Sequence, residues 1–293
     1  MSMTFKPLHP TFIVEVGGID LSKTPTDEQI AELRSALDQH VVLVFRDQDF
    51  EEDQQVAFSA RFGPPERPWR HVRPELKNMV RGQAVSMIGN LDEKGEIVPP
   101  TDVRRLSQRG NMLWHTDSSY RLPPGLYTML YGKEVPPQGG ATEFCDVRAA
   151  YDALPEAMRR RIDDLRVEHN LNRTFKEADS PLLSPAEAQA LPPVTQPLVR
   201  AHPVTGRKSL MLGSPASVIV GWSVEDSRAL LDELLAHATQ ERFCYTHFWK
   251  LRELVMWDNR SSIHRGRPFE DSVHKRQLRR TTICDVASEA ALA

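Results

Sequence analysis

The sequence predicts a mainly β protein in which a β-sandwich or barrel core has helices packed around it. Short apolar or alternating segments of strand length recur along the chain and dominate its last part, whereas only a few segments have helical periodicity. The chain has no internal repeat and no low-complexity tract. We therefore expect one domain over residues 1–293, built from sheets with helices outside them.

Four segments have the apolar spacing and the end signals of helices. Thr26 precedes the first, and Gln29 three residues later predicts a capping box. The second is expected to stop at Gly63. Asp146 and Ser223 are the expected caps of the third and fourth. The predicted helices cover 26–40, 50–63, 146–165 and 223–239.

The predicted strands are rich in β-branched and aromatic residues or alternate between polar and apolar residues. The run "VVLVF" is short and wholly apolar, which is typical of a buried strand, and "PPQGG" predicts a turn that leads into another. The predicted strands cover 41–45, 85–90, 125–135, 141–144, 243–249, 253–259 and 277–286.

The segment 64–107 differs in composition, because it is rich in proline, arginine and lysine. Long segments of this type often carry function, so we predict an active-site loop or lid, with His71, Arg73 and Lys77 as candidates for its entrance. A plain disordered insertion is the alternative.

Charge and cysteine content limit the binding partners and the cellular compartment that we expect. The net charge of −3 indicates no general attraction to nucleic acid or membrane, and no apolar run approaches the length of a membrane span. The N-terminus lacks the pattern of a signal peptide. Three widely separated cysteines argue against a disulfide framework or a structural zinc site, which favours a reducing cytoplasm.

The stretch "NMLWHTDSSY" contains His115 and Asp117 two positions apart. On an extended strand both side chains would point to one face. An imidazole and a carboxylate suit a divalent metal such as Fe(II), and a second histidine would complete a 2-His-1-carboxylate site. His264, after a late strand and a polar turn, is the candidate. The spacing alone is common by chance, so an ordinary hydrogen-bonded pair is the alternative.

Arg276 and Arg280 lie on one face of the last predicted strand. A buried guanidinium needs an anion, and its planar fork suits a carboxylate. Two such residues predict two carboxylate-bearing ligands. A nucleic-acid patch is disfavoured, because the basic residues alternate between faces and no aromatic residues lie between them to stack on bases.

Long motifs of this chain resemble the Fe(II)/2-oxoglutarate-dependent dioxygenases of the taurine dioxygenase family, and within it the phenoxyalkanoate branch. The resemblance runs nearly end to end. The motifs that carry it are "LHP", "VLVFR", "DQQVAFSARFGP", "LWHTDSSY", "VPPQGGATEFCDVRAAYDALP", "HATQERFCYTHFW", "LVMWDNRSSIHRGR" and "LRRTT".

The resemblance implies a double-stranded β-helix, or jelly roll, with flanking helices. It implies that His115, Asp117 and His264 bind Fe(II), and that O2 and the cosubstrate 2-oxoglutarate bind beside them. Thr142 and Arg276 match residues that bind 2-oxoglutarate, and Arg280 matches the residue that binds the acidic group of the substrate. A homo-oligomer is also implied.

Two details qualify the resemblance. The spacing from His264 to Arg276 is one residue longer than usual, so Lys275 is the alternative for the role of Arg276; lysine lacks the bidentate geometry and lies on the other face. Asp117 implies hydroxylation, because family members that halogenate usually have a small residue there. His202, at the end of a predicted strand, is a candidate for a hydrogen bond to substrate.

The expected reaction is hydroxylation of an aryloxyalkanoate such as 2,4-dichlorophenoxyacetate. The resulting hemiacetal would collapse to a phenol and glyoxylate, with succinate and CO2 as coproducts. An alkyl sulfate or a sulfonate such as taurine is the alternative substrate, since Arg280 suits any acidic group. A non-catalytic metal-binding jelly roll is a remote alternative.

Overall fold

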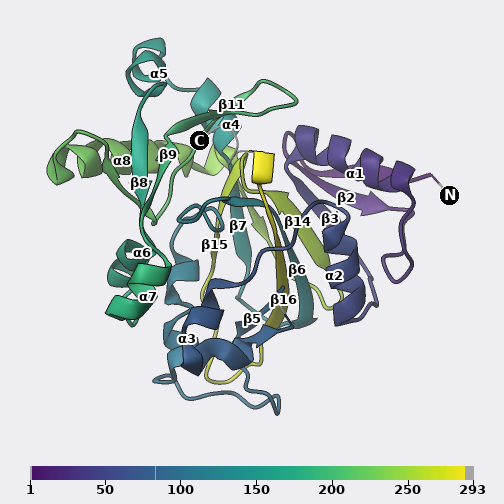
Figure 1. The fold of residues 1–293 in the computed structure, drawn as a ribbon. Coiled ribbons are helices and arrows are strands. Elements are labelled where there is room, and N and C mark those ends of the chain that lie inside the picture. The colour runs from purple at the N-terminus through teal and green to yellow at the C-terminus, as the bar shows by residue number, and fades with distance from the viewer. Residues whose placement is uncertain (1, 83, 288–293) are drawn as a thin grey trace.

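The structure is a computed structural model that describes residues 2–82 and 84–287, and its core is a jelly roll of two facing sheets (Figure 1). The large sheet has the strand order β1-β2-β3-β14-β6-β16-β5-β4, and the smaller sheet the order β13-β7-β15. The large sheet contains β1 (Thr4–His9), β2 (Ile13–Gly17), β3 (Val42–Phe45), β4 (Val80–Arg81), β5 (Val85–Gly89), β6 (Gly125–Glu134), β14 (Leu254–Asp258) and β16 (Gln277–Cys284). The smaller sheet contains β7 (Thr142–Asp146), β13 (Cys244–His247) and β15 (Ser262–Gly266).

Further elements flank this core. Short strands form two small sheets: β8 (Arg166–His169), β9 (Val194–Pro197) and β12 (Ala216–Ile219) in one, β10 (Val199–Ala201) and β11 (Lys208–Leu210) in the other. The α-helices are α1 (Asp27–His40), α2 (Glu52–Ala60), α3 (Val103–Leu106), α4 (Val147–Asp152), α5 (Glu156–Ile162), α6 (Leu171–Glu177), α7 (Pro185–Ala190) and α8 (Val224–Ala238). The 3₁₀ turns are η1 (Trp69–Val72), η2 (Pro74–Met79), η3 (Arg109–Met112) and η4 (Glu241–Phe243).

The large sheet is buried on both faces, which its alternating side chains explain. In β14, Leu254 and Met256 pack into the cluster that includes residues of α1 and α2. Val255 and Trp257 point to the opposite face and pack with Phe144 of β7. Because successive side chains of a strand alternate, the inner face of the large sheet is turned toward the smaller sheet. The mainly β class and the jelly roll are therefore confirmed.

The predicted N-terminal caps are confirmed, whereas α2 ends at Ala60 rather than at Gly63, where it was expected to stop. Thr26 and Gln29 form the capping box of α1, and Ser223 caps α8. Asp146 accepts backbone hydrogen bonds at the start of α4, but the single helix predicted over 146–165 is wrong. It divides into α4 and α5 at Pro155, which has no N–H to donate within a continuous helix. Within the described residues, no helix is long and apolar enough to cross a membrane.

The segment 64–107 has regular structure: η1, η2, β4, β5 and α3 lie within it. Trp69 and Leu76 pack against Leu171 and Phe175 of α6, and β5 pairs with β16. Burial of these apolar side chains holds the segment against the core, so the alternative of a plain disordered insertion is wrong for its described residues.

The cysteines correct a further expectation. Cys145 in β7 lies directly opposite Cys244 in β13, and the two form a disulfide across 99 residues of sequence. The cysteines were expected to form no disulfide framework, and this disulfide was not predicted. Their distance in sequence carried no information about this pairing, because the register of two strands decides it.

Candidate metal centre and cavity

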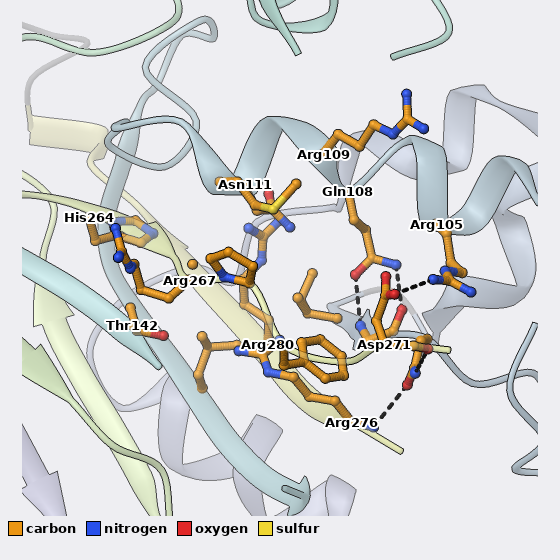
Figure 2. Close-up of a pocket in the computed structure, with 18 of the residues that line it drawn as sticks. Arg105, Gln108, Arg109, Asn111, Thr142, His264, Arg267, Asp271, Arg276 and Arg280 are labelled. Atoms are coloured by element: carbon orange, nitrogen blue, oxygen red, sulfur yellow. Dashed lines mark hydrogen bonds and ion pairs between the residues drawn. The ribbon is translucent and has the colours of Figure 1, made fainter. Parts of the chain in front are cut away.

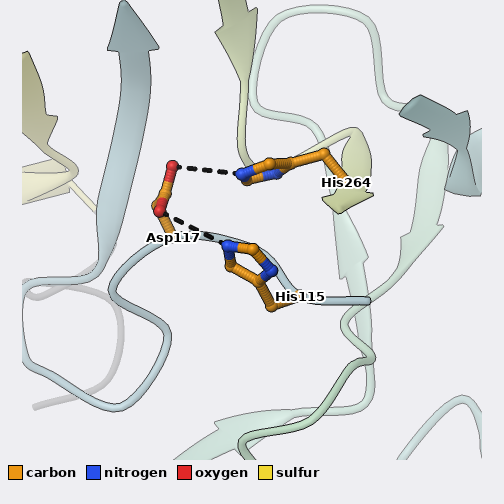
Figure 3. A group of neighbouring side chains, drawn as sticks. All are labelled: His115, Asp117 and His264. Carbon is orange, nitrogen blue, oxygen red and sulfur yellow. Dashed lines mark ion pairs between the residues drawn. The ribbon is translucent and has the colours of Figure 1, made fainter. Parts of the chain in front are cut away.

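His115, Asp117 and His264 converge at one point between the two sheets (Figure 3). His264 lies in β15, and it forms an isolated antiparallel bridge with His115 through two backbone hydrogen bonds of 3.0 and 2.8 Å. Asp117 follows in a turn. The prediction that His115 and Asp117 share a regular strand is wrong, since one bridge and a turn bring their side chains together.

The three side chains leave room for an ion between them. Nε2 of His115 lies 3.8 Å from Oδ1 of Asp117, and Nε2 of His264 lies 3.6 Å from Oδ2. Both distances exceed those of good hydrogen bonds. His115 holds its Nδ1 at 2.8 Å from the carbonyl oxygen of Leu113, which directs Nε2 toward the carboxylate. The donor set of two nitrogens and one oxygen fits Fe(II).

The charges of the three groups also suit a metal. Burial lowers the pKa of both histidines, that of His264 to about 3, so both imidazoles are neutral with a free lone pair at neutral pH. Burial acts to raise the pKa of Asp117, but Arg280 and the two imidazoles outweigh it and lower the pKa to about 2. The site therefore presents neutral nitrogen ligands and one anionic oxygen ligand.

Residues on β6 and β16 and one just after β14 hold Asp117 in place. Thr128 of β6 donates its hydroxyl to Oδ2 at 2.8 Å, and Arg280 of β16 donates to Oδ1 at 2.9 Å. Asn259, just after β14, donates to the Thr128 hydroxyl at 2.9 Å and accepts from the backbone N–H of Asp117 at 3.2 Å. Such partners orient a metal ligand. Sequence reasoning missed Thr128 and Asn259; a threonine within an otherwise apolar stretch was the available signal.

A cavity of about 380 Å³ opens beside the two histidines (Figure 2). Thr142, Arg276 and Arg280 line it together with His115 and His264. The predicted residues thus meet in one place, because Arg276 just before β16, Arg280 within β16 and Thr142 at the start of β7 all border this cavity. The volume lies in the range of small-molecule sites.

Arg276 is suited to bind an anion in this cavity. It is buried, its Nε has no hydrogen-bond partner in the described part of the chain, and its Nη2 donates to the carbonyl oxygen of Gly140 at 3.2 Å. Burial lowers the pKa of Arg276 to about 10. The hydroxyl of Thr142 accepts from Nε1 of Trp249 at 3.0 Å, which leaves its proton available for a ligand.

Comparisons with known proteins agree with this chemistry. Residues 4–282 match the family described as taurine catabolism dioxygenase TauD, TfdA family. The chain belongs to this family. It is 42% identical to the alpha-ketoglutarate-dependent 2,4-dichlorophenoxyacetate dioxygenase of Cupriavidus pinatubonensis, over 98% of this chain and 99% of that protein. It is 35% identical to the (S)-phenoxypropionate/alpha-ketoglutarate-dioxygenase of Sphingobium herbicidovorans, over 98% and 97%.

A solved structure extends the likeness of this dioxygenase to three dimensions. The crystal structure of AAD-2 in complex with Mn(II) and N-oxalylglycine has a TM-score of 0.91 and 40% identity, covering 97% of this chain and 98% of that one. The chain is therefore a non-haem iron dioxygenase, which uses Fe(II), 2-oxoglutarate and O2. Its His-Asp-His site fits that metal.

Two other predicted residues of the dioxygenase lie elsewhere. His202 does not line the cavity described above: its Nε2 lies 3.3 Å from Asp258 and 3.4 Å from Asp38, so the structure does not bring it to substrate. Arg260 neutralises the same pair of carboxylates, which makes this a buried ion-pair network. Lys275 is half-exposed and 3.9 Å from Glu96, which argues against it as the alternative to Arg276.

Proposed function

We propose that this dioxygenase hydroxylates the carbon between the ether oxygen and the carboxylate of an aryloxyalkanoate such as 2,4-dichlorophenoxyacetate. The product is a hemiacetal, which breaks into a phenol and glyoxylate. The observation that carries the proposal is the meeting of the His-Asp-His group with two inward-facing arginines in one cavity. The names of the relatives support the aryloxyalkanoate class.

Each residue has a proposed role. His115, Asp117 and His264 hold the iron. Arg276 and Thr142 hold the far carboxylate of 2-oxoglutarate, and Arg280 meets the acidic group of the substrate. Bound iron would supply the oxidation: one oxygen atom of O2 enters the substrate C–H bond, and the other enters the succinate that forms from 2-oxoglutarate with loss of CO2.

The protein's own contribution is position and charge. Thr128 and Asn259 fix one side of Asp117, so that this ligand does not turn away from the two imidazoles. Arg276 lies just before β16 and Arg280 lies within it, and both border the same cavity, so each would hold its anion at a fixed place beside the metal ligands. Orientation of this kind matters because a displacement of about 1 Å can cost on the order of a hundredfold in rate.

The segment 64–107 supplies part of the cavity wall, through Ile88, Asn90 and Arg105 among others. We infer that it covers the bound substrate, as a lid would. Self-assembly and a cytoplasmic location stay predictions.

The second candidate substrate class is the alkyl sulfates and sulfonates. Arg280 suits their acidic groups as well, and the alkylsulfatase of Acinetobacter baylyi is 28% identical over 85% of this chain. The lower identity makes this the less supported class.

The test is an assay of turnover with Fe(II), 2-oxoglutarate and O2 over a panel of aryloxyacetates, aryloxypropionates, alkyl sulfates and taurine. We expect succinate and an equal amount of phenol with the aryloxyalkanoates, and no turnover by the His115→Ala variant. Succinate release only with alkyl sulfates or taurine would contradict the proposed substrate class and support the second one. Release with no member of the panel would favour a metal-binding protein without this activity.

A further inference from the structure

A second, small cavity lies beside Asp117 and shares His115 and Arg280 with the cavity described above. Its volume is about 40 Å³, and it borders the metal ligands His115 and Asp117 as well as Arg280. Trp69, Tyr120 and Phe175 form its apolar wall. The cavity therefore adjoins the candidate metal site, and its volume suits a small group such as a carboxylate.

Arg70 of η1 lines this cavity and is the unusual residue in it. Its side chain is almost fully buried, with 1% of its surface exposed. Its Nε and Nη1 are buried and have no hydrogen-bond partner among residues 2–82 and 84–287. A buried guanidinium without partners is energetically costly. Its presence here therefore indicates that it binds an anionic ligand.

Arg73, three residues later, shows what a structural arginine looks like in the same segment. It is 4% exposed, and its Nε donates to Glu187 at 2.8 Å while Nη2 donates to the carbonyl oxygen of Leu182 at 2.8 Å. Both arginines lie near the ring of Trp69, at 5.3 Å for Arg70 and 6.0 Å for Arg73. Both arginines thus pack against the ring. Within the described residues, Nε and Nη1 have hydrogen-bond partners in Arg73 and none in Arg70.

The charges around the cavity are unbalanced. Two cations, Arg70 and Arg280, are attracted to the carboxylate of Asp117. Arg280 already donates a hydrogen bond to it. Burial and the nearby Arg280 lower the pKa of Arg70 to about 9, which shows how unfavourable this cation is without an anion. A bound anion between the two guanidinium groups would satisfy both, and the apolar wall would strengthen the attraction.

We propose that Arg70 is a second anchor for the acidic group of the substrate, and that the carboxylate lies in the small cavity between Arg70 and Arg280. This inference rests on the proposed function, because it assigns a new residue to the same substrate. The selectivity of the site for acidic substrates would then depend also on Arg70. The family motifs that pointed to Arg280 did not point to this residue. His71, Arg73 and Lys77 were the residues predicted to act in this segment, and the structure points instead to Arg70.

The first test compares the thermal stability of Arg70→Met, Arg70→Gln and the matched control Arg73→Met. A buried cation without an anion destabilises the ligand-free protein. The two Arg70 variants are therefore expected to melt at or above the wild-type temperature. Arg73→Met loses its ion pair and should melt lower. Arg70 variants that melt several degrees below the wild type, as the control does, would show that Arg70 is structural and would overturn the inference.

The second test measures binding by calorimetry without O2, on protein loaded with Fe(II) and 2-oxoglutarate. The ligands are an aryloxyacetate and its uncharged amide. In Arg70→Met and Arg70→Gln we expect the Kd for the acid to rise at least tenfold, while the Kd values for the amide and for 2-oxoglutarate stay within twofold. In Arg73→Met the ratio between acid and amide should equal that of the wild type, even if packing changes weaken both.

The two possible failures give different results. A wild type that does not bind the acid contradicts the proposed function, and the inference falls with it. A wild type that binds the acid, with Arg70 variants that bind it equally well, contradicts the inference alone.

Discussion

At the scale of single residues, the partners of an arginine distinguish an anion-binding side chain from a structural one. Arg279 of β16 lies on the outer face, where its Nε donates to Gln55 at 2.6 Å and its Nη2 to the carbonyl oxygen of Phe50 at 3.0 Å. Arg276 on the inner face has no ion pair in the described part of the chain and faces the cavity. Both residues are arginines, so only the surroundings in which the fold places each side chain distinguish their roles.

The Arg276→Gln variant is expected to lose affinity for 2-oxoglutarate. Removal of a charge-assisted hydrogen bond costs about 1.5–3 kcal/mol, which corresponds to a rise in the cosubstrate's KM of roughly ten- to a hundredfold. The KM for the primary substrate should change much less. Steady-state kinetics with each substrate varied in turn measure both values.

Lys275→Gln is the matched control for this variant, because Lys275 is adjacent and points to Glu96. Its kinetics should equal those of the wild type. If Lys275→Gln weakened the affinity for the cosubstrate and Arg276→Gln did not, the assignment of the two residues would be reversed.

At the scale of elements, an ion pair attaches the segment of η1 and η2 to α7. Arg73, between the two 3₁₀ turns, reaches Glu187, which also closes the capping box of α7 with Ser184. Both side chains are buried or nearly so. This contact ties the segment that carries Trp69 and Arg70 to the rest of the molecule.

The contribution of this ion pair is expected to depend on pH. The hydrogen bonds from Arg73 hold the pKa of Glu187 at about 2, below its ordinary value of 4.5. Because the folded pKa is depressed, the stabilisation is fully present above about pH 4.5 and is lost as the pH falls toward 2.

The Glu187→Gln variant isolates this effect, since glutamine keeps the capping box and removes the charge. Its thermal unfolding temperature should lie below that of the wild type at pH 7, and the difference should narrow from about pH 4.5 downward and vanish only near pH 2. A difference that stays constant from pH 7 to pH 3 would contradict the role of the charge.

At the scale of the whole molecule, buried neutral histidines link folding to pH. His169 is fully buried in β8; its Nδ1 lies 3.0 Å from the hydroxyl of Ser119. Burial, assisted by Arg200, lowers the pKa of His169 to about 3 from its ordinary 6.5. Between these two values the unfolded chain binds a proton that the folded protein does not. The free energy of unfolding therefore falls as the pH falls below 6.5.

The His169→Asn variant should be less sensitive to acid. One such group contributes a slope of up to about 1.4 kcal/mol per pH unit between its two pKa values. Urea unfolding from pH 7.5 to pH 4.5 should give a shallower pH dependence for the variant than for the wild type. Parallel curves would show that His169 is protonated in the folded protein.

Local patterns in the sequence predicted much of the architecture. The caps of α1 and α8 and the strands β3, β5, β6, β7, β13, β14 and β16 follow from side chains within a few residues of one another. The candidate iron ligands and the two arginines that border the cavity were also predicted from the sequence, because long motifs carry them in order. The break at Pro155 was a local signal that the predicted helix did not take into account.

The contacts that the sequence did not reveal all depend on tertiary structure. The bridge between His115 and His264, the disulfide between Cys145 and Cys244, and the position of His202 beside Asp258 join segments far apart in the chain. The unpartnered state of Arg70 is also a tertiary property, since it is defined by what the surrounding described segments do not supply. By itself, the sequence determined the N-terminal caps of the long helices, most strands of the two facing sheets, the family and the residue types of the metal site. Tertiary structure alone decided which side chains share a cavity, because strand register and packing place them.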